Sequence, residues 1–349
     1  MSNKRITICD IAEELGVSCA IINRALNGKS GVSDELRKKI LATAERLGYR
    51  ANKVARSMAR ATITLGIVIP SSWQDYFSPL KDGISNELDL LLDYNVVGRY
   101  YTVKNSLSHA DTADCIKQCI EDGVSGIVLC DVQPTGMEET FEILRSRGIP
   151  IVVIGDAEGV SEKCLTAIRT DARMSGRMAG EMLSLMTPEG SCVAAFLGSM
   201  TNLEHRDKAQ GFTEEIIKSG RFVSGIYETL DDENIESKLI SEIFPSDISG
   251  VYLATTGAAP IADMLRERGI SVKIVATDTG STVADGIIDG RIQCTIFQDP
   301  AEQGRRAVRA LYEFLAEKTV PPEKIYIVPQ PVLRSNLMEY SHLAPKNIQ

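Results

Sequence analysis

From Ile63 onward the chain alternates short apolar runs with amphipathic helical stretches, and this alternation limits the fold more than any other feature. The apolar runs include LGIVIP, SGIVLC and IPIVVIG, and from TAIRT the pattern repeats through SCVAAFLG, SGVYLAT, VKIVATD and IQCTIF. Helices are expected at 171–186, 203–219, 232–244, 257–268 and 300–317. Continuous apolar strands separated by helices indicate parallel sheets covered on both faces. So many units predict two Rossmann-like α/β lobes.

The first fifty residues predict a different, all-α domain. Thr7 and Asp10 form a capping box for a first helix, and Gly16 supplies the left-handed residue of a tight turn. Ser18 then caps a second helix, expected at 18–26. Two helices joined by so short a glycine turn are typical of a helix-turn-helix unit, whose second helix enters the major groove of DNA.

A third helix is expected to close the core of this domain, beginning at the Ser33 cap and stopping at Gly48. On the second helix, Arg24 is the side chain able to form two hydrogen bonds with the O6 and N7 atoms of guanine. Spacing alone leaves one alternative open, a three-helix protein-interaction module in which Arg24 is an ordinary surface residue.

Charge is divided unevenly along the chain. Residues 1–60 hold twelve Lys and Arg against six Asp and Glu, a net charge of +6, and the rest hold 26 against 41, a net charge of −15. The total of −9 therefore conceals a basic head on an acidic body. This asymmetry is expected where one end of a chain meets phosphate.

The stretches TICDIAEELGVSCAIINRALNG and VSDELRKKILATAERLGYRANKVARSM resemble the head of the LacI/GalR family of bacterial regulators. The resemblance implies base contacts from Cys19, Ala20 and Arg24, phosphate contacts from Asn23 and Asn27, and a hinge helix that inserts Met58 into the minor groove. Asn52 is suited to cap that short helix. The full set expected to contact DNA is Thr7, Ser18, Cys19, Ala20, Asn23, Arg24, Asn27, Asn52, Val54, Ala55 and Met58.

The head departs from the family pattern at three positions. The family usually has a small hydroxyl residue where this chain has Ile21 and Asn23, and a proline where it has Ala51. A recognition helix that begins with Cys19 and Ala20 offers few direct hydrogen bonds to bases. Sequence specificity is therefore expected to depend on contacts with thymine methyl groups and on DNA shape. The missing proline is expected to make the hinge easier to melt.

The body resembles the periplasmic-binding-protein-like sensor that the same family joins to its head. Ligands of such sheets lie beyond the carboxyl ends of the strands, here between the two lobes. By family position, the effector contacts are expected from Trp73, Phe77, Asp171, Arg206, Lys208, Asp278 and Gln298, with Tyr76 beside them. For Asp278 ligand contact is favoured over a helix cap, whereas for Asp171 the cap is favoured. Trp73 is equally compatible with a core position.

The sequence argues against several other functions. No nucleophile elbow, phosphate loop, dinucleotide fingerprint or metal-ligand cluster appears, so we expect neither an enzyme nor a bound cofactor or metal. The eight cysteines form no C-x-x-C pair, which argues against a zinc ribbon or a dithiol redox site, and reduced cytosolic thiols are expected. Without a signal sequence or an apolar span, the chain is expected in the cytoplasm, away from membranes.

These observations predict a DNA-binding transcriptional regulator, most simply a repressor. Its effector is expected to be a sugar or sugar derivative, and a homodimer is expected to bind a near-palindromic double-stranded operator. A ligand-free or partner-controlled regulator is the alternative. The domains are expected at 1–50 for the head, 51–61 for the hinge and 62–341 for the sensor. Within the sensor, the N-lobe is placed at about 62–163 plus 296–322, and the C-lobe at about 164–295 plus 323–341.

Overall fold

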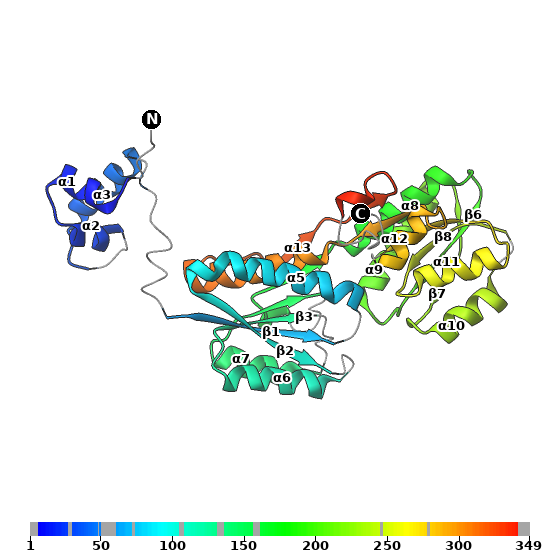
Figure 1. The fold of residues 1–349 in the computed structure, drawn as a ribbon, viewed down its shortest axis with the longest axis horizontal. Coiled ribbons are helices and arrows are strands. Elements are labelled where there is room, and N and C mark those ends of the chain that lie inside the picture. The colour runs from blue at the N-terminus through cyan, green and yellow to red at the C-terminus, as the bar shows by residue number, and fades with distance from the viewer. Residues whose placement is uncertain are drawn as a thin grey trace. The chain divides into compact units, whose positions relative to one another are not determined.

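The computed structural model divides into two compact units, Met1–Ala61 and Thr62–Gln349. Figure 1 shows the fold of each unit as a ribbon. None of the helices within the described part of the chain is long and apolar enough to cross a bilayer. The described residues are 6–26, 30–47, 49, 61–71, 74–104, 108–130, 136–155, 161–244, 247–277 and 280–340.

The first unit contains the three expected helices, α1 (Ile8–Leu15), α2 (Cys19–Leu26) and α3 (Asp34–Arg46). Their core consists of Ile11, Ala12, Ile22, Ala25, Ile40 and Ala44. The predicted caps are confirmed, because the Thr7 side chain accepts from the Asp10 N–H in a capping box and the Ser33 side chain accepts from the Leu36 N–H. Gly16 adopts φ 65°, the left-handed conformation expected of the turn between α1 and α2.

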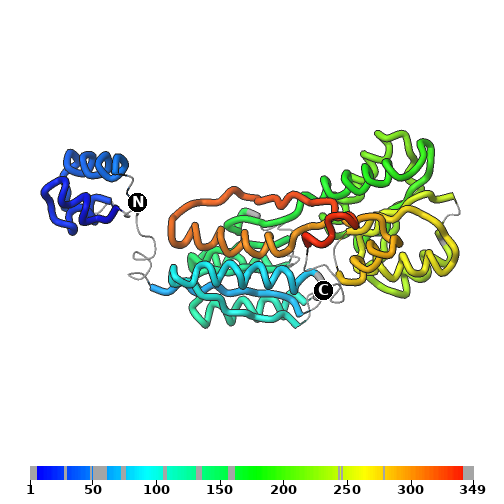
Figure 2. Tube along the Cα trace, turned by 45° about the horizontal axis from the view of Figure 1, so that its top comes forward, coloured from blue at the N-terminus to red at the C-terminus, as the bar shows by residue number. Residues whose placement is uncertain are grey.

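The N-lobe of the second unit is a six-stranded parallel sheet in the order β11-β5-β4-β3-β1-β2. Helices α5 and α13 lie side by side on one face, and α6 and α7 cover the other (Figures 1 and 2). Its strands are β1 (Ile63–Pro70), β2 (Val96–Val103), β3 (Gly126–Cys130), β4 (Ile151–Ile154), β5 (Thr166–Thr170) and β11 (Lys324–Ile327). Its helices are α5 (Gln74–Leu91), α6 (His109–Glu121), α7 (Glu138–Ser146) and α13 (Pro300–Tyr312).

The C-lobe repeats this plan with the order β12-β10-β9-β8-β6-β7, in which only β12 runs antiparallel to its neighbour. Helices α8 and α9 pack on one face, and α11 and α12 on the other. The strands are β6 (Cys192–Leu197), β7 (Phe222–Glu228), β8 (Ile248–Ala254), β9 (Lys273–Thr277), β10 (Cys294–Phe297) and β12 (Gln330–Leu333). The helices are α8 (Ala172–Met186), α9 (Leu203–Lys218), α10 (Glu233–Lys238), α11 (Ala258–Glu267) and α12 (Ser281–Ile288).

The expected fold class, a small helical head and two parallel-sheet lobes, is confirmed, but the lobe boundaries differ from those expected. Strand β5 was placed in the C-lobe and pairs instead with β4 and β11 of the N-lobe. Strand β11 also falls in the expected C-lobe segment, but it lies in the N-lobe sheet. The expected N-lobe segment 296–322 overlaps β10, which pairs in the C-lobe sheet. The physical reason is that an apolar strand followed by a helix has the same sequence pattern in either sheet. Only the strand with which it pairs decides the lobe to which it belongs.

Candidate functional site

Helix α2 presents one face to solvent and the other to the head core. Cys19, Ala20, Asn23 and Arg24 are exposed, whereas Ile22 and Ala25 are buried. Arg37 of α3 donates from Nη1 to the carbonyl of Ala25 at 3.1 Å, which fixes the end of α2 against the core. The exposed face is therefore held rigidly and carries the groove-facing residues named from the sequence.

The remaining predicted DNA contacts divide into two groups. Thr7 and Ser18 lie exposed at the beginnings of α1 and α2, where Ser18 Oγ accepts from the Ile21 N–H at 3.4 Å. Such positions bring hydroxyl groups and backbone N–H groups together at helix N-termini, where phosphate oxygens bind well. Outside the described residues lie the other five, Asn27, Asn52, Val54, Ala55 and Met58.

Three crossover segments link the two lobes, and their backbones are tied together by hydrogen bonds. The Thr170 hydroxyl donates to the Gln298 carbonyl at 3.3 Å. The buried amide of Gln303 donates to that same carbonyl at 2.9 Å and to the Thr170 hydroxyl at 3.2 Å. The Asp171 N–H reaches the Ile327 carbonyl at 3.3 Å. These contacts make the crossovers one connected unit, and no local pattern in the sequence predicts it.

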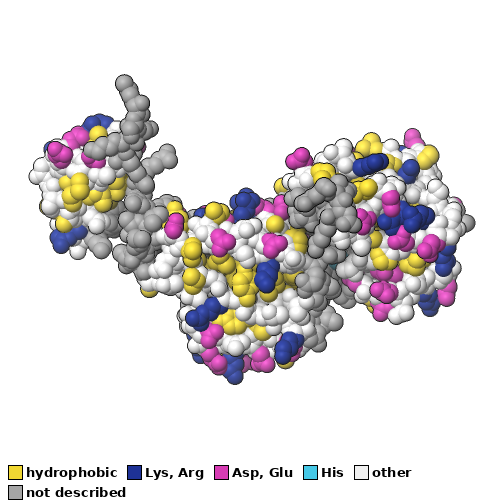
Figure 3. Space-filling view, in the orientation of Figure 1, with side chains coloured by type: hydrophobic (Ala, Val, Ile, Leu, Met, Phe, Trp, Pro, Cys, Tyr) yellow, Lys and Arg dark blue, Asp and Glu magenta, His cyan; other side chains and the backbone are white. Residues whose placement is uncertain are grey.

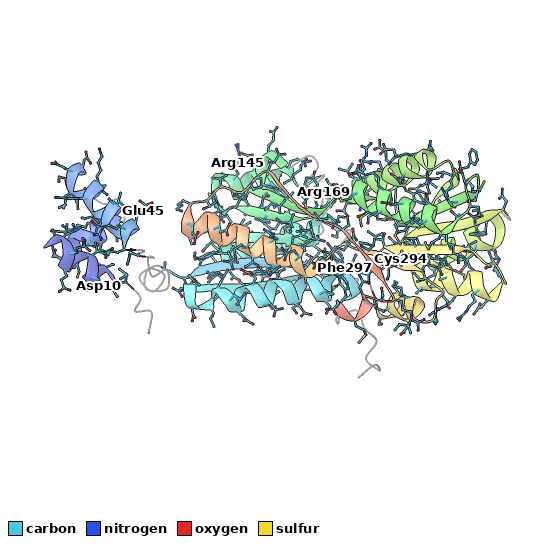
Figure 4. The ribbon with its side chains drawn as sticks, turned by 90° about the horizontal axis from the view of Figure 1, so that it is seen from above. Asp10, Glu45, Arg145, Arg169, Cys294 and Phe297 are labelled. Atoms are coloured by element: carbon cyan, nitrogen blue, oxygen red, sulfur yellow. The ribbon has the colours of Figure 1, made fainter. Side chains whose placement is uncertain are left out.

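Arg169 and Asp207 form a direct ion pair between the lobes. Arg169 is the fourth residue of β5, its side chain is 7% exposed, and its Nη2 lies 3.1 Å from Asp207 Oδ2 on α9. Figure 4 shows Arg169 on the side of the N-lobe that faces the C-lobe. The pair was not expected from the sequence, because a single charged residue inside an apolar strand does not indicate which residue it pairs with or that it belongs to a functional site.

The structure places the predicted effector residues in several environments. Phe77 is 2% exposed and packs in the N-lobe core. Tyr76 donates its hydroxyl to Gln303 Oε1 at 2.9 Å. Asp171 caps α8 by accepting from the Met174 N–H at 2.8 Å, the role favoured for it from the sequence.

Of the other predicted effector residues, three lie within the described part of the chain: Arg206, Lys208 and Gln298. Arg206 is exposed and donates to the carbonyls of Met200 and Thr201 at 3.4 and 3.2 Å. Lys208 is 3% exposed on α9, and Gln298 is 5% exposed in the crossover. Trp73 and Asp278 lie outside the described residues. Burial of a lysine ammonium is unusual in proteins, so Lys208 is the most informative member of this set.

A polar cluster that includes His205 and Asp231 lies at the carboxyl ends of β6, β7 and β8, and the charge of Lys208 acts on it. His205 lies one turn before Lys208 on α9, and a Cβ atom at Gly198 would lie 2.5 Å from His205 Cε1 and 2.6 Å from Asp231 Oδ2. Burial, helped by the nearby Lys208 charge, lowers the pKa of His205 to about 4. His205 Nδ1 is buried without a hydrogen-bond partner among the described residues. An unpartnered polar atom at the strand ends is a place for a ligand atom to bind.

Asp231 and Glu236 supply the acidic side of this cluster. Asp231 Oδ1 accepts from the Thr256 N–H at 2.8 Å, and the Thr255 hydroxyl lies 2.8 Å from both Asp231 Oδ1 and Glu236 Oε1, so its single proton serves one carboxylate at a time. Burial raises the pKa of Glu236. Asp231 also adopts φ 52°, a strained conformation for a residue with a side chain, and such strain concentrates at functional sites.

No group of three or more His, Cys, Asp or Glu side chains in the described ranges could hold a metal ion. A Cβ atom at Gly176 would clash with the Lys208 carbonyl oxygen. Gly176 therefore lets α8 approach α9 closely.

Two family models match the chain. The model described as bacterial regulatory proteins, lacI family, matches residues 7–52, and the model described as periplasmic binding protein domain matches residues 65–319. Catabolite control protein A of Priestia megaterium is 25% identical over 327 residues, covering 90% of this chain and 94% of that protein. The HTH-type transcriptional regulator pepR1 of Lactobacillus delbrueckii is 23% identical, covering 94% and 96%.

Solved structures resemble the second unit. A putative LacI transcriptional regulator from Bacteroides fragilis has a TM-score of 0.67 at 16% identity, covering 80% of this chain and all of that one. AraP, an arabinose binding protein from Geobacillus stearothermophilus, has a TM-score of 0.70 at 21% identity, covering 80% and 99%. At these identities the likeness shows a shared two-lobed fold.

Proposed function

Because the chain belongs to the lacI family of bacterial regulatory proteins, with a periplasmic binding protein domain after its head, we propose that it is a sequence-specific transcriptional repressor controlled by a small effector. The observation that carries the proposal is the exposed face of α2 on a compact three-helix head, and on this face Arg24 is the residue that we propose contacts guanine. Such a regulator acts where bacterial DNA is, in the cytoplasm. Relatives named as regulators favour this function over an enzyme.

We propose a sugar or sugar derivative as the effector, bound between the lobes. The solved structures of this fold include proteins described as bound to tagatopyranose, arabinose and myo-inositol. In this chain Lys208, His205 and Asp231 offer donors and acceptors at the carboxyl ends of the C-lobe strands, as recognition of several hydroxyl groups requires. Arg169 and Gln298 lie where the lobes join, and the sequence adds Trp73 and Asp278 at the ends of β1 and β9.

Coupling of effector to DNA follows from the crossovers. Since Gln303 and Thr170 tie the crossover segments together, closure of the lobes around a ligand moves them as one unit. A ligand can shift operator binding only through unequal affinity for two arrangements, a coupling of about 1–3 kcal/mol in typical cases.

A homodimer binding a near-palindromic duplex is part of the proposal. Leu90 and Leu92 at the end of α5 are 65% and 62% exposed, close in sequence to the edge strand β2, where Tyr100 is 38% exposed. Figure 3 shows hydrophobic side chains among charged ones on the face of the N-lobe in view. Apolar side chains beside an unpaired edge are typical of subunit interfaces. Light scattering on the purified protein is expected to give twice the mass of one chain.

The first experiment tests DNA binding. The purified protein is used to select duplexes from a random pool, and the selected sequence is compared with a scrambled duplex at one salt concentration. We expect a near-palindromic site bound at least about a thousandfold more tightly than the scrambled duplex. Selection of no sequence, with equal affinity for all duplexes, would overturn the proposed function.

The second experiment identifies the effector class. Thermal unfolding is followed with sugars, sugar phosphates, polyols and nucleobases, because a ligand that binds only the folded state raises the melting temperature. Asp278→Asn should lose the shift, and Asp285→Asn, an exposed control on α12, should keep it. If no compound produces a shift while the protein still selects a duplex, the alternative of a ligand-free or partner-controlled regulator is favoured.

A further inference from the structure

Two cysteines of the head lie in direct contact. Cys9 is the second residue of α1 and Cys19 is the first residue of α2, and both side chains are exposed. Cys19 Sγ donates to Cys9 Sγ across 3.1 Å. Both are free thiols, as the sequence predicts, but they form a contact that the absence of a C-x-x-C pair does not indicate. Spacing could not reveal it, because the residues are ten positions apart and meet only through the turn at Gly16.

The other six cysteines are in a different situation. All lie in the second unit, and Cys119, Cys130 and Cys294 are buried in its cores, where no oxidant reaches them directly. Burial raises the pKa of Cys119, Cys164 and Cys294 to about 12, which keeps them as unreactive thiols. The head pair is set apart by exposure and by direct contact rather than by pKa, because the hydrogen bond with Cys19 also raises the pKa of Cys9.

We propose that Cys9 and Cys19 form a reversible disulfide when the protein meets an oxidised low-molecular-weight disulfide of the glutathione type. One cysteine thiolate attacks a sulfur of the oxidant, breaks its S–S bond and releases one glutathione thiolate. The second cysteine gives up its proton and attacks the mixed disulfide, so the Cys9–Cys19 bond forms and a second glutathione thiolate leaves. Two electrons pass from the cysteine sulfurs to the oxidant.

The consequence for DNA binding rests on the proposed function, whereas the disulfide itself does not. A bond of about 2 Å requires the sulfur atoms to approach by roughly a further 1 Å, so the Cys19 side chain is pulled toward α1. Cys19 begins the groove-facing side of α2. A bonded Cys19 therefore loses its freedom to contact a base edge, and the first turn of α2 is fixed in a new position.

Mass spectrometry tests the disulfide on the full-length protein. The protein is equilibrated in glutathione buffers that contain an excess of reduced glutathione, and free thiols are then alkylated. Trypsin releases residues 6–24 as one peptide with both cysteines, so the disulfide removes two hydrogen atoms from its mass. Cleavage after Glu13 or Glu14 should leave two fragments joined until a reductant is added. A peptide 6–24 that stays fully alkylated at every glutathione ratio tested would overturn the proposal.

DNA affinity in the same buffers tests the consequence. The probe is the duplex selected by the reduced protein, and we expect oxidised wild type to bind at least about tenfold more weakly, with recovery on reduction. Cys9→Ser removes the partner sulfur without changing a predicted DNA contact. Under excess reduced glutathione, a mixed disulfide between Cys19 and glutathione accumulates little, whereas the Cys9–Cys19 disulfide is favoured by the proximity of its two thiols. Because Cys9→Ser cannot form the intramolecular disulfide, this variant should keep its affinity for the duplex.

Cys115→Ser is the matched control and should respond as wild type does. If Cys9→Ser loses affinity to the same extent as wild type, the switch is overturned even where the disulfide forms. If the reduced protein selects no duplex, the proposed DNA-binding function fails, while the mass measurement still decides whether the disulfide forms.

Discussion

The guanidinium of Arg169 and the carboxylate of Asp207 form an ion pair that joins β5 of the N-lobe to α9 of the C-lobe at 3.1 Å. Arg169 is nearly buried and Asp207 is partly exposed, so the carboxylate helps to compensate the buried cation across the boundary. Because Asp207 lies between His205 and Lys208 on α9, this pair connects the polar cluster of the C-lobe to the N-lobe sheet.

We expect Asp207→Asn to lower the free energy of unfolding by about 1–3 kcal/mol, because it leaves the Arg169 charge buried with a weaker partner. The measurement is urea unfolding followed by circular dichroism. Glu142→Gln removes an ion pair on the surface of α7 and should leave stability close to that of wild type. Equal effects of the two substitutions would show that the lobe contact adds no stability.

The crossing of α8 and α9 depends on glycines. A Cβ atom at Gly211 would clash with the Arg173 carbonyl oxygen, just as one at Gly176 would clash with that of Lys208. Gly211→Ala should therefore cost about 1–3 kcal/mol of unfolding free energy, despite the higher helix propensity of alanine. Glu181→Ala on the exposed face of α8 is the control and should stay within about 0.5 kcal/mol of wild type. A Gly211→Ala protein as stable as this control would contradict the close crossing.

His205 predicts a pH dependence with a defined sign. Its pKa of about 4 in the folded state lies below the ordinary value of 6.5, so the unfolded chain binds the proton more readily between these values. The contribution of His205 to stability is complete above pH 6.5 and is lost as pH falls toward 4, by no more than about 3 kcal/mol. Asp231, whose charge opposes this shift, and Lys208, which reinforces it, are both present in the folded state.

The test compares wild type with His205→Gln by urea unfolding at several pH values from 7.5 to about 5. Below pH 6.5 the stability of wild type relative to the variant should fall by up to about 1.4 kcal/mol per pH unit. His109→Gln, at an exposed histidine that begins α6, should follow wild type throughout. A constant difference between wild type and His205→Gln across this range would show that His205 is not held neutral by burial.

Arg24→Ala should weaken binding to the selected duplex by about 1–3 kcal/mol and relax the preference for one guanine position. Binding to a scrambled duplex should change much less, since that depends on the total positive charge of the head. Fluorescence anisotropy at a fixed salt concentration measures both. Arg145→Ala, an exposed arginine of α7 labelled in Figure 4, is the charge-matched control. Equal losses on both duplexes would assign Arg24 to the phosphate backbone.

Local interactions let the sequence determine much of this protein. The capping box of Thr7 with Asp10 and the left-handed turn at Gly16 act within four residues, so they could be read without knowing the rest of the chain. The same holds for the bounds of α8 and α9 and for the two-lobed α/β class, because apolar periodicity records which faces are buried.

Contacts between distant residues were decided only by the tertiary structure. The lobe that β5 joins depends on which strands it pairs with, and nothing within TAIRT distinguishes the two sheets. The Cys9–Cys19 contact, the Arg169–Asp207 pair and the Gln303 bonds at the crossovers each join residues whose proximity arises from packing. Periodicity and caps specify which face of an element is buried, but they carry no information about the element that covers it.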